Sequence, residues 1–357
     1  MTTPAFSICV PNYNYADYLG ETLQSALTQT FGDLEVCLAD NASTDGSMEV
    51  VRAIDDDRLR WSENACNVGF AGNLNKATEM ARGERMLLLS SDDLMHADAL
   101  ATYHALLEGL DESERERVLL VAGHQRVDGS GRYVATPEPT PWLWGDAPVD
   151  ESATRRCGHT VRRLPAREVL RRGLLTARNP LPFVSLCYSR ATWAGLEGYV
   201  GARHINPDKL FGFRALATCD TVYYVDTPLF SYRWHDNNQT AQQARTATLK
   251  FLVDEYSSTF DLPPFVLEAA GLTRDDLVDT FLKHDVGLHY LRELARGNRM
   301  LARRAALFAQ ATYPKEAARH PYVVALRVAV GLGPLGQRLA SAMEGPIYRR
   351  WRKTVRP

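Results

Sequence analysis

Short apolar runs alternate with segments of helical periodicity over the first 125 residues of the chain. Each run is five or six residues long, which is typical of strands. After the first run, Leu19, Leu23, Ala26 and Leu27 recur three or four residues apart, which is typical of a helix. Strands that alternate with helices predict an α/β fold with a mostly parallel central sheet. The predicted strands are 6–10, 34–39, 59–63, 85–90, 118–123 and 221–226, and the predicted helices are 19–27, 47–54, 71–82 (ended by Gly83) and 96–109.

The pattern changes in the last third of the chain. Strand-like runs stop after about residue 245, and helix-like segments continue to the end. We therefore expect a domain over residues 1–240, with halves 1–125 and 126–240, followed by a helical region over 241–357 that ends in a basic tail.

Composition and charge narrow the class of protein. The chain has 357 residues, of which 45% are hydrophobic and 24% charged, which is ordinary for a globular protein. No uncharged apolar run reaches the roughly 18 residues of a membrane-spanning helix, and the start does not read as a secretory signal. The six cysteines form no CxxC pair, which fits a reducing cytosol. These features predict a cytoplasmic protein.

The net charge of −2 hides a basic C-terminal segment. Residues 315–357 hold nine Lys or Arg and two Glu, a balance of +7. Such a segment indicates an anionic partner such as a membrane surface, or else a solvated helical tail. Residues 345–357 combine Trp351 with clustered basic residues, which favours peripheral contact with the inner face of the cell membrane. No base-stacking or groove-reading motif accompanies them, so nucleic acid is not expected.

Polar residues follow three of the predicted strands. In an open parallel sheet, ligands bind at the carboxyl ends of the strands, so these residues are candidates for one site. No GxGxxG or GxxxxGK[ST] motif is present, so phosphates would be neutralised by a metal and side chains rather than by a glycine-rich loop. The three groups are Pro11-Asn12-Tyr13-Asn14, the segment from Asp40 to Asp45, and Ser90-Ser91-Asp92-Asp93.

The adjacent Asp92 and Asp93 are the first candidates for metal ligands. Two neighbouring carboxylates repel each other unless a cation or hydrogen bonds offset their charge. Carboxylate oxygens suit Mg²⁺ or Mn²⁺, which often also bind substrate phosphates. In the alternative interpretation, one Asp caps the following helix and the other faces solvent.

Taken together, these motifs resemble the family 2 glycosyltransferases of the GT-A fold. The resemblance covers roughly residues 5–240 and implies an inverting enzyme that moves a sugar from a nucleoside diphosphate sugar to an acceptor hydroxyl. The motifs that carry it are Val10-Pro11-x-Tyr13-Asn14, Asp40-x-x-Ser43-x-Asp45, Asn67-x-Gly69, Asn75, Ala81-x-Gly83-Glu84, Ser91-Asp92-Asp93 and Leu229-Phe230-Ser231-Tyr232-Arg233-Trp234-His235.

The resemblance also implies roles for individual residues. Asp208 would be the catalytic base, and Asp92, Asp93 and His235 would hold Mn²⁺ or Mg²⁺. Arg233 would be a positive partner of the leaving diphosphate, or else a structural ion pair. Ser90 stands where the family usually has Asp, and Pro207 where it has Glu. The residues expected to bind the donor are Pro11, Tyr13, Asn14, Asp40 (to the base), Asn41, Asn75 and Arg233.

Substrates and alternatives stay open at this level. A uridine diphosphate sugar is the first donor candidate and a thymidine diphosphate sugar the second. The acceptor is a saccharide or a lipid-linked glycan, as in envelope polysaccharide synthesis. A sugar nucleotidyltransferase and a catalytically inactive sugar-nucleotide-binding domain are the alternative functions.

Overall fold

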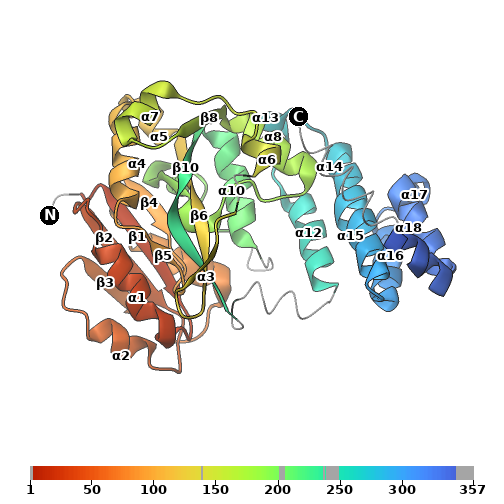
Figure 1. Ribbon diagram of the computed structural model, residues 1–357, viewed down its shortest axis with the longest axis horizontal. Coiled ribbons are helices and arrows are strands. Elements are labelled where there is room, and N and C mark those ends of the chain that lie inside the picture. Colours follow the sequence, from red (N-terminus) through yellow and green to blue (C-terminus); the bar gives the residue numbers. More distant parts are fainter. Residues whose placement is uncertain (1–2, 138–139, 201–205, 236–237, 239–248, 343–357) are drawn as a thin grey trace. The chain divides into compact units, whose positions relative to one another are not determined.

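The computed structural model describes residues 3–137, 140–200, 206–235, 238 and 249–342 (Figure 1). The chain divides into two compact units. The boundary predicted at residue 240 lies among residues 239–248, outside the described residues. Unit 1 comprises Met1–Thr140, Ala147–Val169 and Pro180–Asp236, and unit 2 comprises Pro141–Asp146, Leu170–Asn179 and Asn237–Pro357.

Ten strands among the described residues of unit 1 form one sheet, in the order β3-β2-β1-β4-β9-β6-β10-β5, with β7 beside β6 and β8 beside β10. The pairs β1–β2, β2–β3, β1–β4 and β6–β10 are parallel, and β9 runs antiparallel between β4 and β6. The predicted α/β class with a mostly parallel sheet is confirmed. The strands are β1 (Phe6–Asn12), β2 (Leu34–Asp40), β3 (Leu59–Glu63), β4 (Arg85–Leu88), β5 (Leu94–Met95), β6 (Val118–Asp128), β7 (Tyr133–Ala135), β8 (Val161–Pro165), β9 (Cys187–Ser189) and β10 (Thr221–Trp234).

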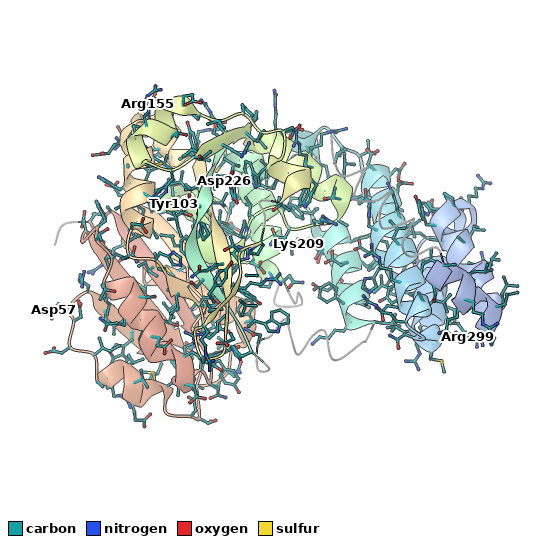
Figure 2. All side chains as sticks on the ribbon, in the orientation of Figure 1. Asp57, Tyr103, Arg155, Lys209, Asp226 and Arg299 are labelled. Carbon is teal, nitrogen blue, oxygen red and sulfur yellow. The ribbon has the colours of Figure 1, made fainter. Side chains whose placement is uncertain are left out.

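Helices cover the sheet of unit 1 (Figure 1). Alternate residues of β1, namely Phe6, Ile8 and Val10, are buried in a core shared with α1 and α4. Tyr103 of α4 lies in this core (Figure 2) and donates a 2.6 Å hydrogen bond to the carbonyl of Ser185. The helices are α1 (Ala16–Leu27), α2 (Ser47–Arg52), α3 (Gly69–Glu79), α4 (Ala99–Glu108), α5 (Glu112–Glu116), α7 (Glu151–Cys157), α9 (Arg190–Gly195) and α10 (Pro207–Thr218), with a 3-10 turn at Phe183–Ser185.

The last strand is longer than its apolar run predicts. The predicted segment 221–226 is only the first part of β10, which continues to Trp234. The register shifts around Pro228, where the strand is irregular, because proline cannot donate a hydrogen bond to the ladder. Beyond this irregularity β10 pairs with both β6 and β5. The continuation brings Arg233 and His235 toward the segment that follows β4.

Unit 2 is helical over its described residues, which confirms the predicted helical C-terminal region. Apolar residues of α12, α14, α15, α16 and α18 form its core. None of the described helices has the length and apolar character needed to cross a membrane. The helices are α6 (Pro141–Trp144), α12 (Lys250–Asp261), α13 (Pro264–Ala270), α14 (Arg274–Thr280), a π-helical segment (Phe281–Leu288), α15 (His289–Ala295), α16 (Arg299–Thr312), α17 (Pro314–Arg319), α18 (Pro321–Gly331) and residues 334–342; α8 (Ala166–Thr176) spans the division between the units.

Gly83 lies against β1 and does not end a helix, because α3 already ends at Glu79. The Ser7 hydroxyl accepts a hydrogen bond from the Gly83 amide (2.8 Å) and donates one to Glu35 (2.7 Å). A Cβ atom on Gly83 would lie 2.6 Å from the Ser7 hydroxyl and 2.7 Å from the Ser7 amide nitrogen. Glycine is therefore required here by the close approach of two backbone segments.

We predict that Gly83→Ala lowers the free energy of unfolding by about 2 kcal/mol, because the methyl group forces β1 and the segment before β4 apart. Gly32→Ala is the matched control, since a Cβ atom there meets nothing within 4 Å. Urea unfolding of the two variants would measure the difference. Equal stability of both variants would show that the backbone adjusts around Ser7 without strain.

Candidate functional site

The carboxyl ends of β1, β2 and β4 lie side by side, as the sequence predicts. Asn12 at the end of β1 is paired with Asp40 at the end of β2, and β4 flanks β1 on the other side. The Ser91 hydroxyl donates a 2.9 Å hydrogen bond to the Pro11 carbonyl, which ties the segment after β4 to the end of β1. The three polar groups therefore form one edge of the sheet, called the rim below.

The Asp40 carboxylate is buried and holds the loop that follows it. It accepts hydrogen bonds from the Asn12 side-chain amide (2.8 Å), the Ser43 hydroxyl (2.6 Å) and the Ser43 backbone amide (2.8 Å). Asn14 joins this loop from β1, because its side-chain oxygen accepts a hydrogen bond from the Thr44 amide at 2.8 Å. Asp40 and Asn14, both predicted to bind the donor, thus also build the rim that would receive it.

A group of asparagines extends this network. Asn41 is buried; its side chain accepts hydrogen bonds from the Val68 amide (2.9 Å) and from Asn64 (3.2 Å) and donates one to Asn67 (3.0 Å). Asn73 donates to the Asn12 and Ala39 carbonyls. The Asn67-x-Gly69 motif marks one part of this network in the sequence. No sequence motif includes Asn64 or Asn73, so their role was not predicted. Tyr13, with 43% of its surface exposed, is the aromatic side chain presented at this part of the rim.

Asp92 and Asp93 have different environments, although the sequence groups them as metal ligands. Asp93 accepts a 2.9 Å hydrogen bond from the Arg233 backbone amide and another from the Ser90 side chain. Burial, and then the neighbouring Asp92, raise the pKa of Asp93 well above its ordinary value. Asp93 is thus held by protein donors, and its proton is bound more tightly. Asp92, in contrast, lies next to a second side chain that can bind a metal.

That side chain is His235, which follows β10. Its Nε2 atom lies 3.0 Å from Oδ2 of Asp92, and only 7% of the His235 side chain is exposed. The imidazole packs on the Tyr18 ring with centroids 4.4 Å apart and meets the Tyr15 ring edge-on at 6.0 Å. Burial, then Asp92 and Asp93, raise the pKa of the Tyr15 hydroxyl. The sequence did not predict that these tyrosines orient the imidazole.

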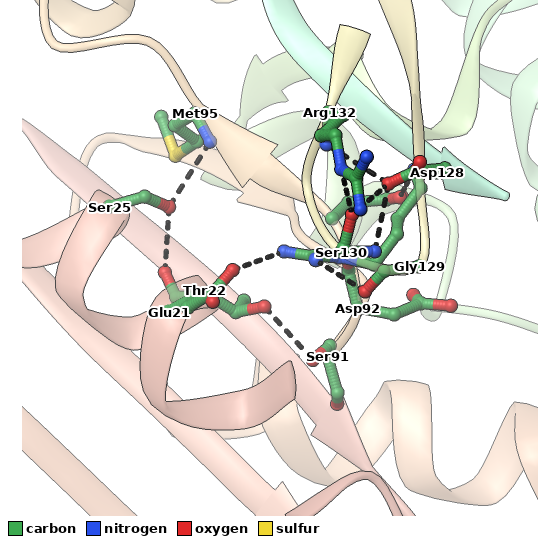
Figure 3. Close-up of polar contacts among 12 residues, drawn as sticks. Glu21, Thr22, Ser25, Ser91, Asp92, Met95, Asp128, Gly129, Ser130 and Arg132 are labelled. Atoms are coloured by element: carbon green, nitrogen blue, oxygen red, sulfur yellow. Dashed lines mark hydrogen bonds and ion pairs between the residues drawn. The ribbon is translucent and has the colours of Figure 1, made fainter. Parts of the chain in front are cut away.

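Arg233 joins the segments around Asp92. Its guanidinium is buried and donates to the Glu21 carboxylate (2.6 Å), the Asp92 carbonyl (2.8 Å) and the Gly129 carbonyl (3.2 Å). Figure 3 shows that Glu21, Asp92 and Gly129 lie close to one another. The guanidinium also lies over the Tyr18 ring, 5.0 Å from its centroid. The structural ion pair, one of the two environments expected for Arg233, is therefore observed, and its contact with a diphosphate stays a prediction.

The Asp92–His235 pair fits a divalent cation that takes most of its ligands from elsewhere. A carboxylate oxygen and an imidazole nitrogen are both ligands for first-row divalent metals, and Mg²⁺ or Mn²⁺ at phosphate sites often uses one or two protein ligands with water and phosphate oxygens. The described residues contain no cluster of three or more His, Cys, Asp or Glu side chains suited to a metal. Water molecules, or the phosphate oxygens of a bound substrate, would complete the coordination.

Asp208 lies near the start of α10, in the second residue of that helix. It lines a small, mostly apolar pocket together with Leu88, the last residue of β4, and with Tyr188 and Tyr199. Leu88 precedes Asp92 by four residues, so this pocket adjoins the carboxyl end of β4. The position suits a group that receives a proton from a substrate beside the rim.

Asn75 has a different task from the predicted donor contact. Its side-chain amide donates a 2.9 Å hydrogen bond to the Tyr199 carbonyl and accepts one of 2.8 Å from the Tyr199 backbone amide. The turn before Tyr199 has positive φ at Glu197 (56°) and Gly198 (70°). Asn75 therefore fixes the turn before Tyr199, and its contact with the donor stays a prediction.

Comparison with known proteins places these features in a family. Residues 7–136 match the family described as Glycosyl transferase family 2. The chondroitin synthase of Pasteurella multocida (strain Pm70) is 38% identical over 99 residues, which is 27% of this chain and 10% of that protein. The UDP-Glc:alpha-D-GlcNAc-diphosphoundecaprenol beta-1,3-glucosyltransferase WfaP of Escherichia coli is 36% identical over 87 residues, 24% of this chain and 35% of that protein. This chain thus spans between a tenth and about a third of the length of these relatives.

A solved structure shares the fold over nearly the whole chain. The crystal structure of S. aureus TarS 1–349 in complex with UDP-GlcNAc has a TM-score of 0.62 and 18% identity, covering 97% of this chain and 91% of that one. The motifs at the strand ends, the family match and this shared fold agree with one another. Residues 7–136 are therefore similar to glycosyl transferase family 2, and the chain has the GT-A type of α/β fold.

Proposed function

We propose that this protein is an inverting glycosyltransferase that moves a sugar from a nucleoside diphosphate sugar to an acceptor hydroxyl, with a divalent cation held by Asp92 and His235. The observation that carries the proposal is the 3.0 Å pairing of Asp92 with His235 at the rim, since two ligand-type side chains from distant parts of the chain converge where the family binds its donor. Screening uridine and thymidine diphosphate sugars for turnover, with and without Mn²⁺, tests it. Release of a nucleoside diphosphate separates this reaction from nucleotidyl transfer, which would release pyrophosphate.

The nucleoside end of the donor is assigned to the exposed part of the rim. Tyr13 offers an exposed ring on which a base can stack, beside Pro11. Asp40, Asn41 and Asn14 shape this surface through the hydrogen bonds described above. Their backbone positions are fixed before any ligand arrives, which lowers the entropy lost on binding.

The diphosphate end is assigned to Asp92 and His235. A bound Mn²⁺ or Mg²⁺ would supply Lewis-acid stabilisation of the charge that develops on the leaving diphosphate. Asp92 would contribute a carboxylate oxygen and His235 its Nε2 atom. Arg233 donates a hydrogen bond to the Asp92 carbonyl, so it positions Asp92 as a ligand of the metal. Asp93 supports the same segment through its hydrogen bond to the Arg233 amide.

The acceptor side is assigned to the surroundings of Asp208. As a general base, the Asp208 carboxylate would take the proton from the acceptor hydroxyl as its oxygen attacks the anomeric carbon. Leu88, Tyr188 and Tyr199 line the pocket beside Asp208 and are almost fully buried, so it has room for about one water molecule and not for a sugar. The acceptor would therefore lie outside the pocket and reach Asp208 from its partly exposed side. Attack from the side opposite to the leaving diphosphate would invert the anomeric configuration.

A uridine diphosphate sugar is the first donor to test and a thymidine diphosphate sugar the second. The name of WfaP gives UDP-Glc as donor and a diphosphoundecaprenol-linked sugar as acceptor, which supports a uridine donor and a lipid-linked acceptor here. A cytoplasmic enzyme at the inner face of the cell membrane would suit such an acceptor. Residues 345–357, proposed to contact that membrane, lie outside the described residues.

We predict that Asp92→Asn abolishes transfer. Substituting a residue that only supports a metal ligand typically weakens metal binding about 10- to 100-fold, and Asp92→Asn should weaken Mn²⁺ binding by more than that because it changes the ligand itself. Asp93→Asn should keep most Mn²⁺ binding, because this carboxyl is held by protein donors and its pKa is raised. Titration calorimetry with Mn²⁺, beside circular dichroism for folding, distinguishes the two. Equal losses in both folded variants would mean that both carboxylates bind the metal.

We predict that Asp208→Asn lowers kcat by about 10²- to 10⁴-fold while the donor dissociation constant stays unchanged, because an amide cannot accept the acceptor's proton. Steady-state kinetics and donor titration of the same variant provide both values. Weakened donor binding with little change in kcat would assign Asp208 to the donor site instead.

We predict that Glu21→Gln weakens Mn²⁺ binding by about tenfold, because the buried Arg233 loses its charged partner and the segment at Asp92 loosens. Glu79→Gln is the matched control, since Glu79 is also an exposed helical glutamate and pairs with Lys76 at the surface. Titration calorimetry of both folded variants measures the effect. An unchanged Mn²⁺ affinity in Glu21→Gln would limit this ion pair to a structural role.

A further inference from the structure

Unit 2 presents a row of exposed aliphatic side chains near the end of its described residues. They recur four residues apart, at Val324 and Val328 of α18 and at Leu332 directly after it, and the helical residues 334–342 add Leu335 and Leu339. Between 36% and 57% of the surface of each is exposed, whereas the buried side of α18 packs into the core. Most solvent-facing helices carry charged residues at such positions. α16 exposes Met300 and Leu307 in the same way, with 66% and 54% of their surfaces exposed.

Basic side chains lie among these aliphatic residues. Residues 299–342 contain seven Lys or Arg and one Glu, a balance of +6, and all seven basic residues are exposed. None of the seven forms an ion pair with a carboxylate within the described residues. Residues 1–298 carry the opposite charge, −12, because the whole chain has −2 and residues 343–357 have +4. The seven are Arg299 (labelled in Figure 2), Arg303, Arg304, Lys315, Arg319, Arg327 and Arg338.

We propose that this surface, formed by α16, α18 and residues 334–342, docks on an anionic lipid bilayer. Helices that lie in a membrane interface combine exposed aliphatic side chains with Lys and Arg, because the former enter the acyl boundary while the latter meet the lipid phosphates. Here the two kinds of side chain occur on the same helices. Because residues 1–298 are acidic, an anionic bilayer attracts this surface and the basic residues 343–357 rather than the rest of the chain.

Charge also decides against two other occupants of the surface. A second copy docked through the same face would bring the five basic residues of α16, α18 and residues 334–342 against five more, and like charges at an interface oppose association. Residues 343–357 carry five Lys or Arg and one Glu, so they would not neutralise the surface either. A bilayer containing anionic lipids supplies negative headgroups for the basic side chains and an acyl region for the exposed aliphatic side chains.

Vesicle flotation of the full chain tests this proposal. We expect binding to phosphatidylcholine vesicles that contain phosphatidylglycerol, weaker binding at high salt, and little binding to phosphatidylcholine alone. The double substitution Val328→Gln and Leu335→Gln should lower the bound fraction about tenfold, because two aliphatic side chains no longer enter the bilayer. Phe260→Gln is the matched control: Phe260 is exposed on α12 of the same unit, and its loss should leave binding unchanged.

The outcomes separate the occupants. Loss of flotation in the double variant but not in Phe260→Gln, with both folded by circular dichroism, supports the proposal. Wild-type flotation by the double variant, or a wild-type dimer in sedimentation that the double variant dissociates, overturns it. Flotation that disappears only when residues 343–357 are removed also overturns it, because the tail would then be the sole contact. Flotation requires no donor or metal, so the result is independent of the proposed transfer reaction.

Discussion

The ion pair between Arg233 and Glu21 is the interaction on which the candidate site depends. A guanidinium with 1% of its surface exposed is stable only if its charge is paired and its donors are satisfied. Glu21 of α1, the Asp92 carbonyl after β4 and the Gly129 carbonyl after β6 meet this requirement. One cation thereby joins segments from three parts of the chain. Asp92 is held through its own carbonyl, and His235, two residues beyond Arg233, emerges beside it.

The sequence predicted the fold well where the apolar pattern was strong. Strands buried on both faces, such as β1, β2 and β4, are mostly apolar, with Ser7, Glu35 and Arg85 among their few polar residues, so their place in a parallel sheet followed from the pattern alone. The two- and three-residue strands β5 and β9 are too short to show a periodicity, and their neighbours in the sheet determine them. Pro228 hid the second half of β10, because a proline in a run usually marks its end, whereas here the strand continues past an irregularity.

The candidate site was predictable only in part. Asp92 was a candidate because it follows a buried strand beside two other polar strand ends, and the pairing with His235 agrees with that role. Asp93 shares the same motif, but its partner is the backbone of a residue 140 positions away, which no local pattern shows. Glu21 resembles any exposed glutamate of an amphipathic helix, since 62% of its side chain is exposed. Only the tertiary structure identifies it as the partner of a buried cation.

The rim is ordered before it meets a ligand. Asn14 and Ala42 have positive φ angles of 58° and 60°, a conformation that costs about 1–3 kcal/mol for residues other than glycine and persists only where the surroundings hold it. The hydrogen bonds of Asp40 and Ser43 supply that hold. Ordering a flexible loop on binding would cost about 1–2 kcal/mol of backbone entropy per residue, a loss already incurred here on folding. The resemblance assigns Asp40 to the nucleobase of the donor, and in the structure its carboxylate also stabilises the backbone of the rim through hydrogen bonds. The ring of Tyr13 is exposed, so it is well placed to contact a ligand.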